Sequence, residues 1–137
     1  MLEKKIKYTD FNGEDHEETF RFHISKAEMT RKEFTTEGGY SNYLQKIVET
    51  KDSTKLYKIF EELVCLSYGE KSDDGKRFIK ERNGEPLVKA FMETPAYDEL
   101  IMSLFDPKEA SAFVKGIFPK DIVDQVDENK LMKQING

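Results

Sequence analysis

The sequence lacks most of the residue patterns by which an enzyme or a metal protein is usually identified. It has a single cysteine, Cys65, in 137 residues, which excludes an internal disulfide and any metal site with several cysteine ligands. Its two histidines, His16 and His23, have no partner at a spacing typical of metal ligands or of a nucleophile and its base. The pair Gly38-Gly39 lacks the lysine and third glycine of a phosphate-binding loop. We therefore expect no enzyme, no cofactor and no metal.

Long apolar runs are also missing. No stretch approaches the roughly 18 apolar residues that a membrane span needs, and residues 1–8 alternate charged and apolar side chains, unlike a signal peptide. The formal net charge of −5 disfavours nucleic acid as a partner. We expect a soluble protein in a reducing cytoplasm. Cys65 lies in the apolar run Leu63–Leu66, where we expect it to be buried.

The amino-terminal pattern predicts a β-hairpin. Apolar and polar side chains alternate over residues 3–9 and 17–24, the period of a half-buried strand. Asn12-Gly13 lies between the two segments, and both residues tolerate a positive φ. Because an isolated hairpin is marginally stable, its apolar face must pack against other elements.

About six helices follow. Ser25 and Glu28 have the spacing of a capping box, so a short helix should run to about Phe34. Gly38-Gly39 breaks the pattern as a hinge, and a second helix runs from Tyr40 to about residue 50. A strong apolar stripe after residue 53 predicts the central core helix, with Gly69 as its left-handed cap.

The carboxyl-terminal half predicts three more helices. The first begins after a loop at 83–86, with Pro86 in its first turn. Thr94-Pro95 and Asp106-Pro107 start the other two, and Pro119 ends the last. We therefore predict a mostly helical α+β fold: one domain at residues 1–119, and a weakly structured or helical tail at residues 120–137.

The stretch LSYGEKSDDGKRFIK, residues 66–80, joins the two helical halves. We expect Asp73-Asp74-Gly75 to form an ordinary turn, because its residues lack the ligand spacing of a calcium loop. The segment that follows is basic and holds one aromatic residue. It either presents an apolar anchor within a basic rim to a partner, or it packs Phe78 inward while its cations stay solvated. The candidate binding residues here are Lys71, Lys76, Arg77, Phe78 and Lys80.

A family resemblance rests on this stretch and on two others, IKYTDFNGEDHEETFRFHISKAEM at residues 6–29 and FMETPAYDELIMSLFDPKEASAFVKGIFP at residues 91–119. Over roughly residues 4–119 the chain resembles the tail assembly chaperones of long-tailed bacteriophages and prophages. The resemblance implies a non-enzymatic protein of the host bacterial cytoplasm. It implies binding to the tape measure protein, help in assembling tail-tube protein around it, and absence from the mature virion.

A helical partner suggests where to look for a binding surface, because an amphipathic helix docks through its apolar face. We hypothesise a groove between the helices at 94–105 and 107–117, fringed by the basic segment. Methionine-rich surfaces adapt to varied partners, which adds Met92, Met102 and Phe118 to the candidates. The alternative is that these side chains belong to the core, and we expect this for Phe105.

Two other functions remain open. A structural virion protein, such as a small connector or tail-completion protein, would have a similar size and acidity. A small enzyme or regulatory module has no positive support in the residues. The hairpin edge also offers a route to a homo-oligomer, although nothing in the sequence sets a symmetry.

Overall fold

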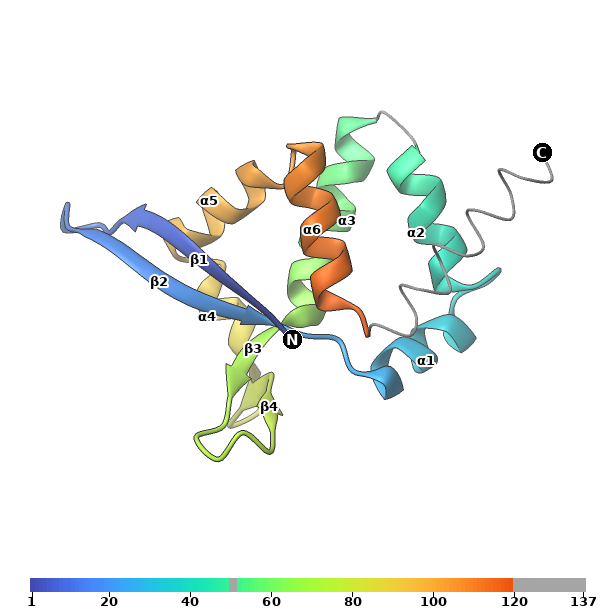
Figure 1. Cartoon of the computed structure of the whole chain (residues 1–137), viewed down its shortest axis with the longest axis horizontal. Helices are drawn as coiled ribbons and strands as arrows, with labels where there is room; N and C mark the ends of the chain where they lie inside the picture. The colour runs from blue at the N-terminus through green and yellow to red at the C-terminus, as the bar shows by residue number, and fades with distance from the viewer. Residues whose placement is uncertain (50–51, 120–137) are drawn as a thin grey trace.

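The computed structural model describes residues 1–49 and 52–119. The fold is α+β, with an N-terminal β-hairpin and six helices in the described part of the chain, as predicted (Figure 1). The strands are β1 (Leu2–Thr9), β2 (Asp15–Phe22), β3 (Tyr68–Lys71), β4 (Phe78–Ile79), β5 (Glu81–Arg82) and β6 (Glu85–Pro86). The helices are α1 (Lys26–Thr35), α2 (Tyr40–Glu49), α3 (Ser53–Ser67), α4 (Leu87–Phe91), α5 (Pro95–Ser103) and α6 (Pro107–Ile117). The predicted tail at 120–137 lies outside the described residues.

The β1–β2 hairpin forms where the alternating pattern predicts it, and its loop end projects beyond the helices (Figure 1). Its loop closes through a hydrogen bond from the Asp10 amide to the Glu14 carbonyl oxygen, 2.8 Å. Gly13 adopts a φ of 84°, which glycine reaches without strain. The exposed tip carries Phe11, whose side chain is 87% exposed.

The predicted starts of α1, α5 and α6 are confirmed. The Glu28 amide donates to Ser25 Oγ at 3.1 Å and the Ser25 amide donates back to Glu28 Oε1 at 3.0 Å, which is a complete capping box. Thr94 caps α5 and Asp106 caps α6, and each is followed by a proline at the first helical position.

The segment after α3 differs from the prediction. It forms the short antiparallel strands β3 and β4 around the predicted 73–75 turn, and β3 pairs with β2 to extend the hairpin into a four-stranded sheet. Gly69 is not a left-handed helix cap. It lies in β3, where a Cβ atom would come within 2.5 Å of the Ile79 carbonyl oxygen. Glycine is needed here because β4 passes so close.

The loop predicted at 83–86 is also more ordered than expected. β5 and β6 form a two-stranded hairpin whose turn residues Asn83 and Gly84 have φ values of 55° and 79°. These values fit the turn that Asn-Gly favours. Pro86 lies outside α4 as its extended N-cap rather than in its first turn.

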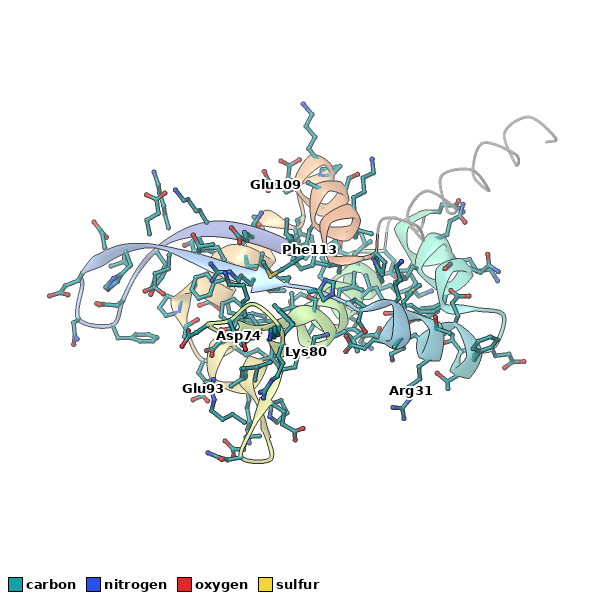
Figure 2. The ribbon with its side chains drawn as sticks, turned by 60° about the horizontal axis from the view of Figure 1, so that its bottom comes forward. Arg31, Asp74, Lys80, Glu93, Glu109 and Phe113 are labelled. Atoms are coloured by element: carbon teal, nitrogen blue, oxygen red, sulfur yellow. The ribbon has the colours of Figure 1, made fainter. Side chains whose placement is uncertain are left out.

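Aromatic side chains from five elements form the core. Phe22 is fully buried, and its ring contacts those of Tyr68, Phe91 and Phe113 at centroid distances of 5.3–6.1 Å. Phe113 points inward from α6 (Figure 2). Phe91 also stacks on Tyr68 at 4.3 Å and meets Tyr97 of α5 edge-on. The apolar face of the hairpin therefore packs against the carboxyl-terminal helices.

Two side chains are more exposed than the sequence predicts. Cys65 is exposed rather than buried, because the buried side of α3 is filled by Ile59, Phe60, Leu63 and Val64. Since apolar residues occupy a whole turn at 63–66, one of them must face outward. Phe105, expected in the core, is 42% exposed at the end of α5.

Candidate partner-binding surfaces

The turn between β3 and β4 is held by its own side chains. Asp74 Oδ1 accepts from the Lys76 amide at 3.0 Å and from Ser72 Oγ at 2.7 Å, and these bonds lower the pKa of the Asp74 carboxyl. The Arg77 amide donates to Ser72 Oγ at 3.0 Å. The turn is thus an ordinary Asp-Gly turn, as predicted, and its own donors already occupy the Asp74 carboxylate.

The basic candidates of this segment separate into two groups. Lys71, Lys76 and Arg77 are exposed around the turn. Lys80, at the end of β4, is half-buried: its Nζ donates to both carboxylate oxygens of Glu28, at 2.9 and 2.8 Å, and to the Leu66 carbonyl oxygen at 2.6 Å. Lys80 therefore joins the β3–β4 hairpin to α1 and α3. Of these four cations, Lys71, Lys76 and Arg77 are left to form a basic rim.

Phe78 is half-buried beside His23, with ring centroids 5.6 Å apart and the rings nearly perpendicular. Burial lowers the pKa of His23, and the positive charges of the N-terminus and Lys80 act in the same direction. His23 packs against Phe78, and its lowered pKa favours the neutral ring. The Phe78 ring therefore packs against the protein, where it supports the β3–β4 hairpin, and only part of it is available to a partner.

The methionine and aromatic candidates of the carboxyl-terminal half also differ from one another. Phe118 is only 7% exposed and belongs to the core. Met102 is 69% exposed on α5, and Phe105 lies one turn further on. Met92 is half-buried, with its Sδ 3.8 Å from Cys65 Sγ on α3.

Two of these side chains, Met92 and Phe105, contact α3. The ring of Phe105 meets that of Phe60 on α3 edge-on, at 5.6 Å. Tyr57 and Cys65 are exposed on α3 and lie eight residues apart, which places them on one side of that helix. We refer below to Tyr57, Cys65, Met92, Met102 and Phe105 together as the α3–α5 surface.

Sequence reasoning found Met92 and Met102 but missed Tyr57, Cys65 and Phe105 as exposed residues. The signal was present in the spacing: Tyr57, Glu61 and Cys65 recur every four residues, so they occupy one helix face beside the buried stripe. The predicted α5–α6 groove stays a prediction, and the contacts to Cys65 and Phe60 point to α3 as the neighbouring helix.

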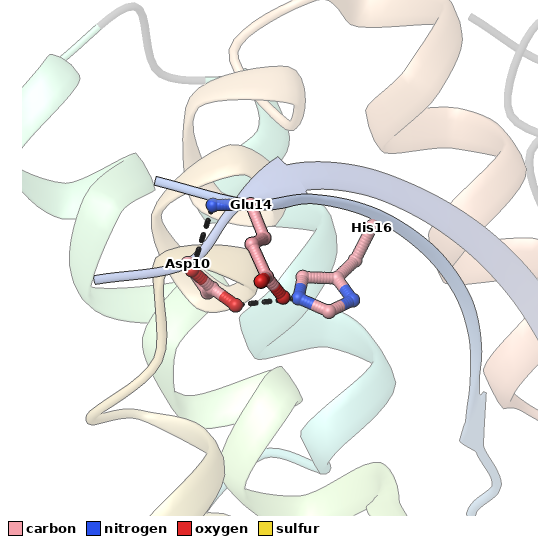
Figure 3. Close-up of side chains that lie close together, drawn as sticks. All are labelled: Asp10, Glu14 and His16. Atoms are coloured by element: carbon pink, nitrogen blue, oxygen red, sulfur yellow. Dashed lines mark hydrogen bonds and ion pairs between the residues drawn. The ribbon is translucent and has the colours of Figure 1, made fainter. Parts of the chain in front are cut away.

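The hairpin loop gathers a third group of polar side chains that the sequence analysis did not join. Asp10, Glu14 and His16 bring their ligand-type atoms within 4.8 Å of one another (Figure 3). Asp10 Oδ2 pairs with His16 Nε2 at 2.6 Å, and Asp10 Oδ1 accepts from the Asn12 and Glu14 amides. The hydrogen bond to Asp10 raises the pKa of His16. The Asp10 carboxylate is therefore occupied by contacts within the hairpin loop, and this group stabilises the loop.

Comparison with known proteins identifies the family. The family model described as phage tail assembly chaperone matches residues 1–136. The chain belongs to this family. The resemblance seen in the sequence is thereby confirmed, and it now covers nearly the whole chain. A search of curated proteins and a search of solved structures each gave no match.

Membership among the tail assembly chaperones implies interaction with phage tail proteins and suggests a non-enzymatic role in assembly rather than in the virion. Within the described residues, no helix combines the length and apolar character needed to cross a bilayer. A surface that binds another protein is therefore the relevant kind of functional site, and the α3–α5 surface and the exposed cations of the β3–β4 turn are the two candidates.

Proposed function

We propose that this protein is a non-enzymatic chaperone that binds the tape measure protein in the host cytoplasm and assists tail-tube assembly around it. Membership in the tail assembly chaperone family supports the chaperone role. A tape measure protein is long and largely helical, so its amphipathic segments need a partner that covers their apolar faces until the tube encloses them. The protein then dissociates and is absent from the finished virion.

The α3–α5 surface is the observation that carries this proposal. Met102 is exposed on α5, and Phe105, two residues after that helix ends, is also exposed and contacts Phe60 of α3. Met92 contacts the exposed Cys65 of α3, and Tyr57 is exposed on the same helix. Adjacent exposed apolar side chains mark binding sites more often than scattered single ones. Thioether side chains adapt to differing apolar partners, which suits a chaperone that holds more than one segment of a long helix.

The exposed cations Lys71, Lys76 and Arg77 are a second part of the proposal. They would attract acidic segments of a tail protein and speed encounter without anchoring it, because exposed ion pairs contribute little to affinity. Phe78, Lys80 and Phe118 also stay candidates, but each packs within the protein, so a substitution there would change stability along with binding.

Co-expression with the tape measure protein of the same phage tests the proposal. We expect most of the tape measure protein to be soluble with the wild-type chaperone and insoluble without it. Met102→Asp should lower the co-purified amount about tenfold, because losing one exposed thioether anchor and burying a charge costs about 1.4 kcal/mol or more. Phe34→Asp, a similar change at an exposed residue of α1, is the matched control.

The proposal fails if the tape measure protein is equally soluble with and without this protein. The alternative of a structural virion protein is tested on the same material. Mass spectrometry of purified phage particles should find this protein absent, whereas stoichiometric amounts in the particle would favour a connector or tail-completion role.

A further inference from the structure

Acidic side chains accompany the exposed apolar ones of the α3–α5 surface. Glu61 lies on α3 midway between Tyr57 and Cys65, and Asp98 lies one turn before Met102 on α5. Within the described residues, neither carboxylate forms a hydrogen bond or ion pair with another side chain. Lys58 is the nearest cation along α3, and the neighbouring carboxylate of Glu62 is already paired with Lys32 of α1 at 3.7 Å.

A buried hydroxyl lies beneath this surface. Tyr97 is 7% exposed, and its Oη has no hydrogen-bond partner among the described residues. Burial raises the pKa of Tyr97 to about 12, and Glu61, Tyr57 and Cys65 act in the same direction. Tyr97 belongs to α5 and these three residues belong to α3, so the buried hydroxyl is on the side of α5 that faces α3. An unpaired buried hydroxyl is costly, and a donor or acceptor supplied from outside would relieve that cost.

The net charge of the protein, like these two carboxylates, favours a cationic partner. The formal net charge is −5, so the long-range field attracts a cationic partner and repels an anionic one. Carboxylates beside an apolar strip match a helix whose apolar face is bordered by lysine or arginine, because the cations meet the carboxylates when the apolar faces meet.

We propose that the α3–α5 surface selects basic amphipathic helices, with Glu61 and Asp98 pairing with lysine or arginine beside the apolar face of the partner. This inference rests on the proposed function, since it specifies which helical segments of a tape measure protein the chaperone holds. It extends that function by assigning the charge that the partner must carry and the two carboxylates that recognise it.

Two synthetic peptides test the inference directly on the full chain. Both are amphipathic helices of about 18 residues with the same leucine face, and one borders that face with lysines, the other with glutamates. At low ionic strength we expect the lysine peptide to bind at least about fivefold tighter by fluorescence anisotropy, and the preference to shrink with added salt. The lysine peptide should also slow alkylation of Cys65, the only cysteine, which reports where it binds.

Charge reversal supplies the matched variants. Glu61→Lys combined with Asp98→Lys should abolish or reverse the preference. Glu99→Lys, an exposed change on another side of α5, should keep it. Equal affinities for the two peptides, unchanged alkylation of Cys65, or a preference that survives the double reversal would overturn the inference. If the double variant does not fold, the salt dependence of peptide binding and the protection of Cys65 in the wild-type protein still test the inference.

The two proposals fail in different ways. If the tape measure protein is retained in co-expression but the peptides bind equally, the inference on charge is wrong and the chaperone function stands. If the lysine peptide is preferred and protects Cys65 but the tape measure protein is not retained, the chemistry of the surface stands and the proposed partner is wrong.

Discussion

Replacing Gly69 by alanine tests the packing of the β3–β4 hairpin against its neighbours. The added Cβ would lie 2.5 Å from the Ile79 carbonyl oxygen and 2.6 Å from a ring carbon of Phe78. The first obstacle is backbone, so relief requires β4 to move away from β3. Such overpacking typically costs about 1–3 kcal/mol.

A smaller gain opposes this cost. Alanine restricts the unfolded chain more than glycine does, which stabilises a protein by about 0.4–1 kcal/mol where the native backbone suits alanine. Gly69 lies in a strand and is not among the residues with positive φ, so this gain applies in full. The net expectation is that Gly69→Ala lowers the free energy of unfolding by about 1–2 kcal/mol, or the Tm by about 4–8 °C.

Gly116→Ala is the informative control. Its Cβ would lie 2.7 Å from Leu2 Cδ1 and 3.2 Å from Leu2 Cβ and Cγ, so Leu2 must rotate and shift slightly. No backbone atom stands in the way, and Gly116 lies in a helix, where alanine is favoured over glycine. We expect the free energy of unfolding to stay within about 0.5 kcal/mol of wild type or to rise. Urea denaturation of both variants measures the difference, and a Gly69→Ala protein as stable as wild type would refute the close approach of β4.

Two further predictions concern ion pairs. Asp10 raises the pKa of His16 above 6.5, and the same pairing holds the pKa of Asp10 below 3.8. The pair therefore stabilises the fold at pH values between these two, and its effect is lost as pH rises through the His16 pKa or falls through the Asp10 pKa. NMR titration should find a lower His16 pKa in Asp10→Asn, and an unchanged value would contradict the pairing. Lys80→Met should lower the free energy of unfolding by about 1 kcal/mol, because Lys80 joins the hairpin to Glu28; urea denaturation that gives wild-type stability would show the bridge to be dispensable.

The features predicted correctly from the sequence are those set by local chemistry. Gly13, Ser25 with Glu28, and Thr94-Pro95 each determine their backbone within a few residues, and each appears as predicted. Asn12, by contrast, does not adopt the positive φ that an Asn-Gly turn can use. The amphipathic stripe of α3 likewise identifies the central helix, because its period is strong over several turns.

The strands that were missed depend on distant partners. β4 is two residues long, and β3 exists because Tyr68 and Gly69 pair with Phe22 and Arg21 of β2, more than forty positions earlier in the chain. A four-residue segment such as β3 carries no sequence pattern that predicts pairing with so distant a strand. The tight turn at Asn83-Gly84 did carry the Asn-Gly signal, but its flanking strands are too short to alternate.

The candidate site was harder to predict than the fold for a related reason. Sequence patterns tell which side of a helix is apolar, but they do not tell how much of that side the neighbouring elements cover. Phe105 and Phe118 both end apolar stripes, yet the first is 42% exposed and the second 7% exposed. The difference arises from tertiary packing, so the residue type alone could not distinguish an exposed side chain that can bind a partner from one buried in the core.

The exposure of Tyr57, Cys65, Met102 and Phe105 has weight because the chain is poor in apolar residues, at 37%. Burying a large apolar side chain contributes about 1.5–3 kcal/mol, so a small acidic protein loses stability by leaving several of them in water on neighbouring helices. A single exposed residue such as Phe11 needs no explanation. A group on two adjoining helices, bordered by unpaired carboxylates, is better accounted for by a partner that covers it during tail assembly.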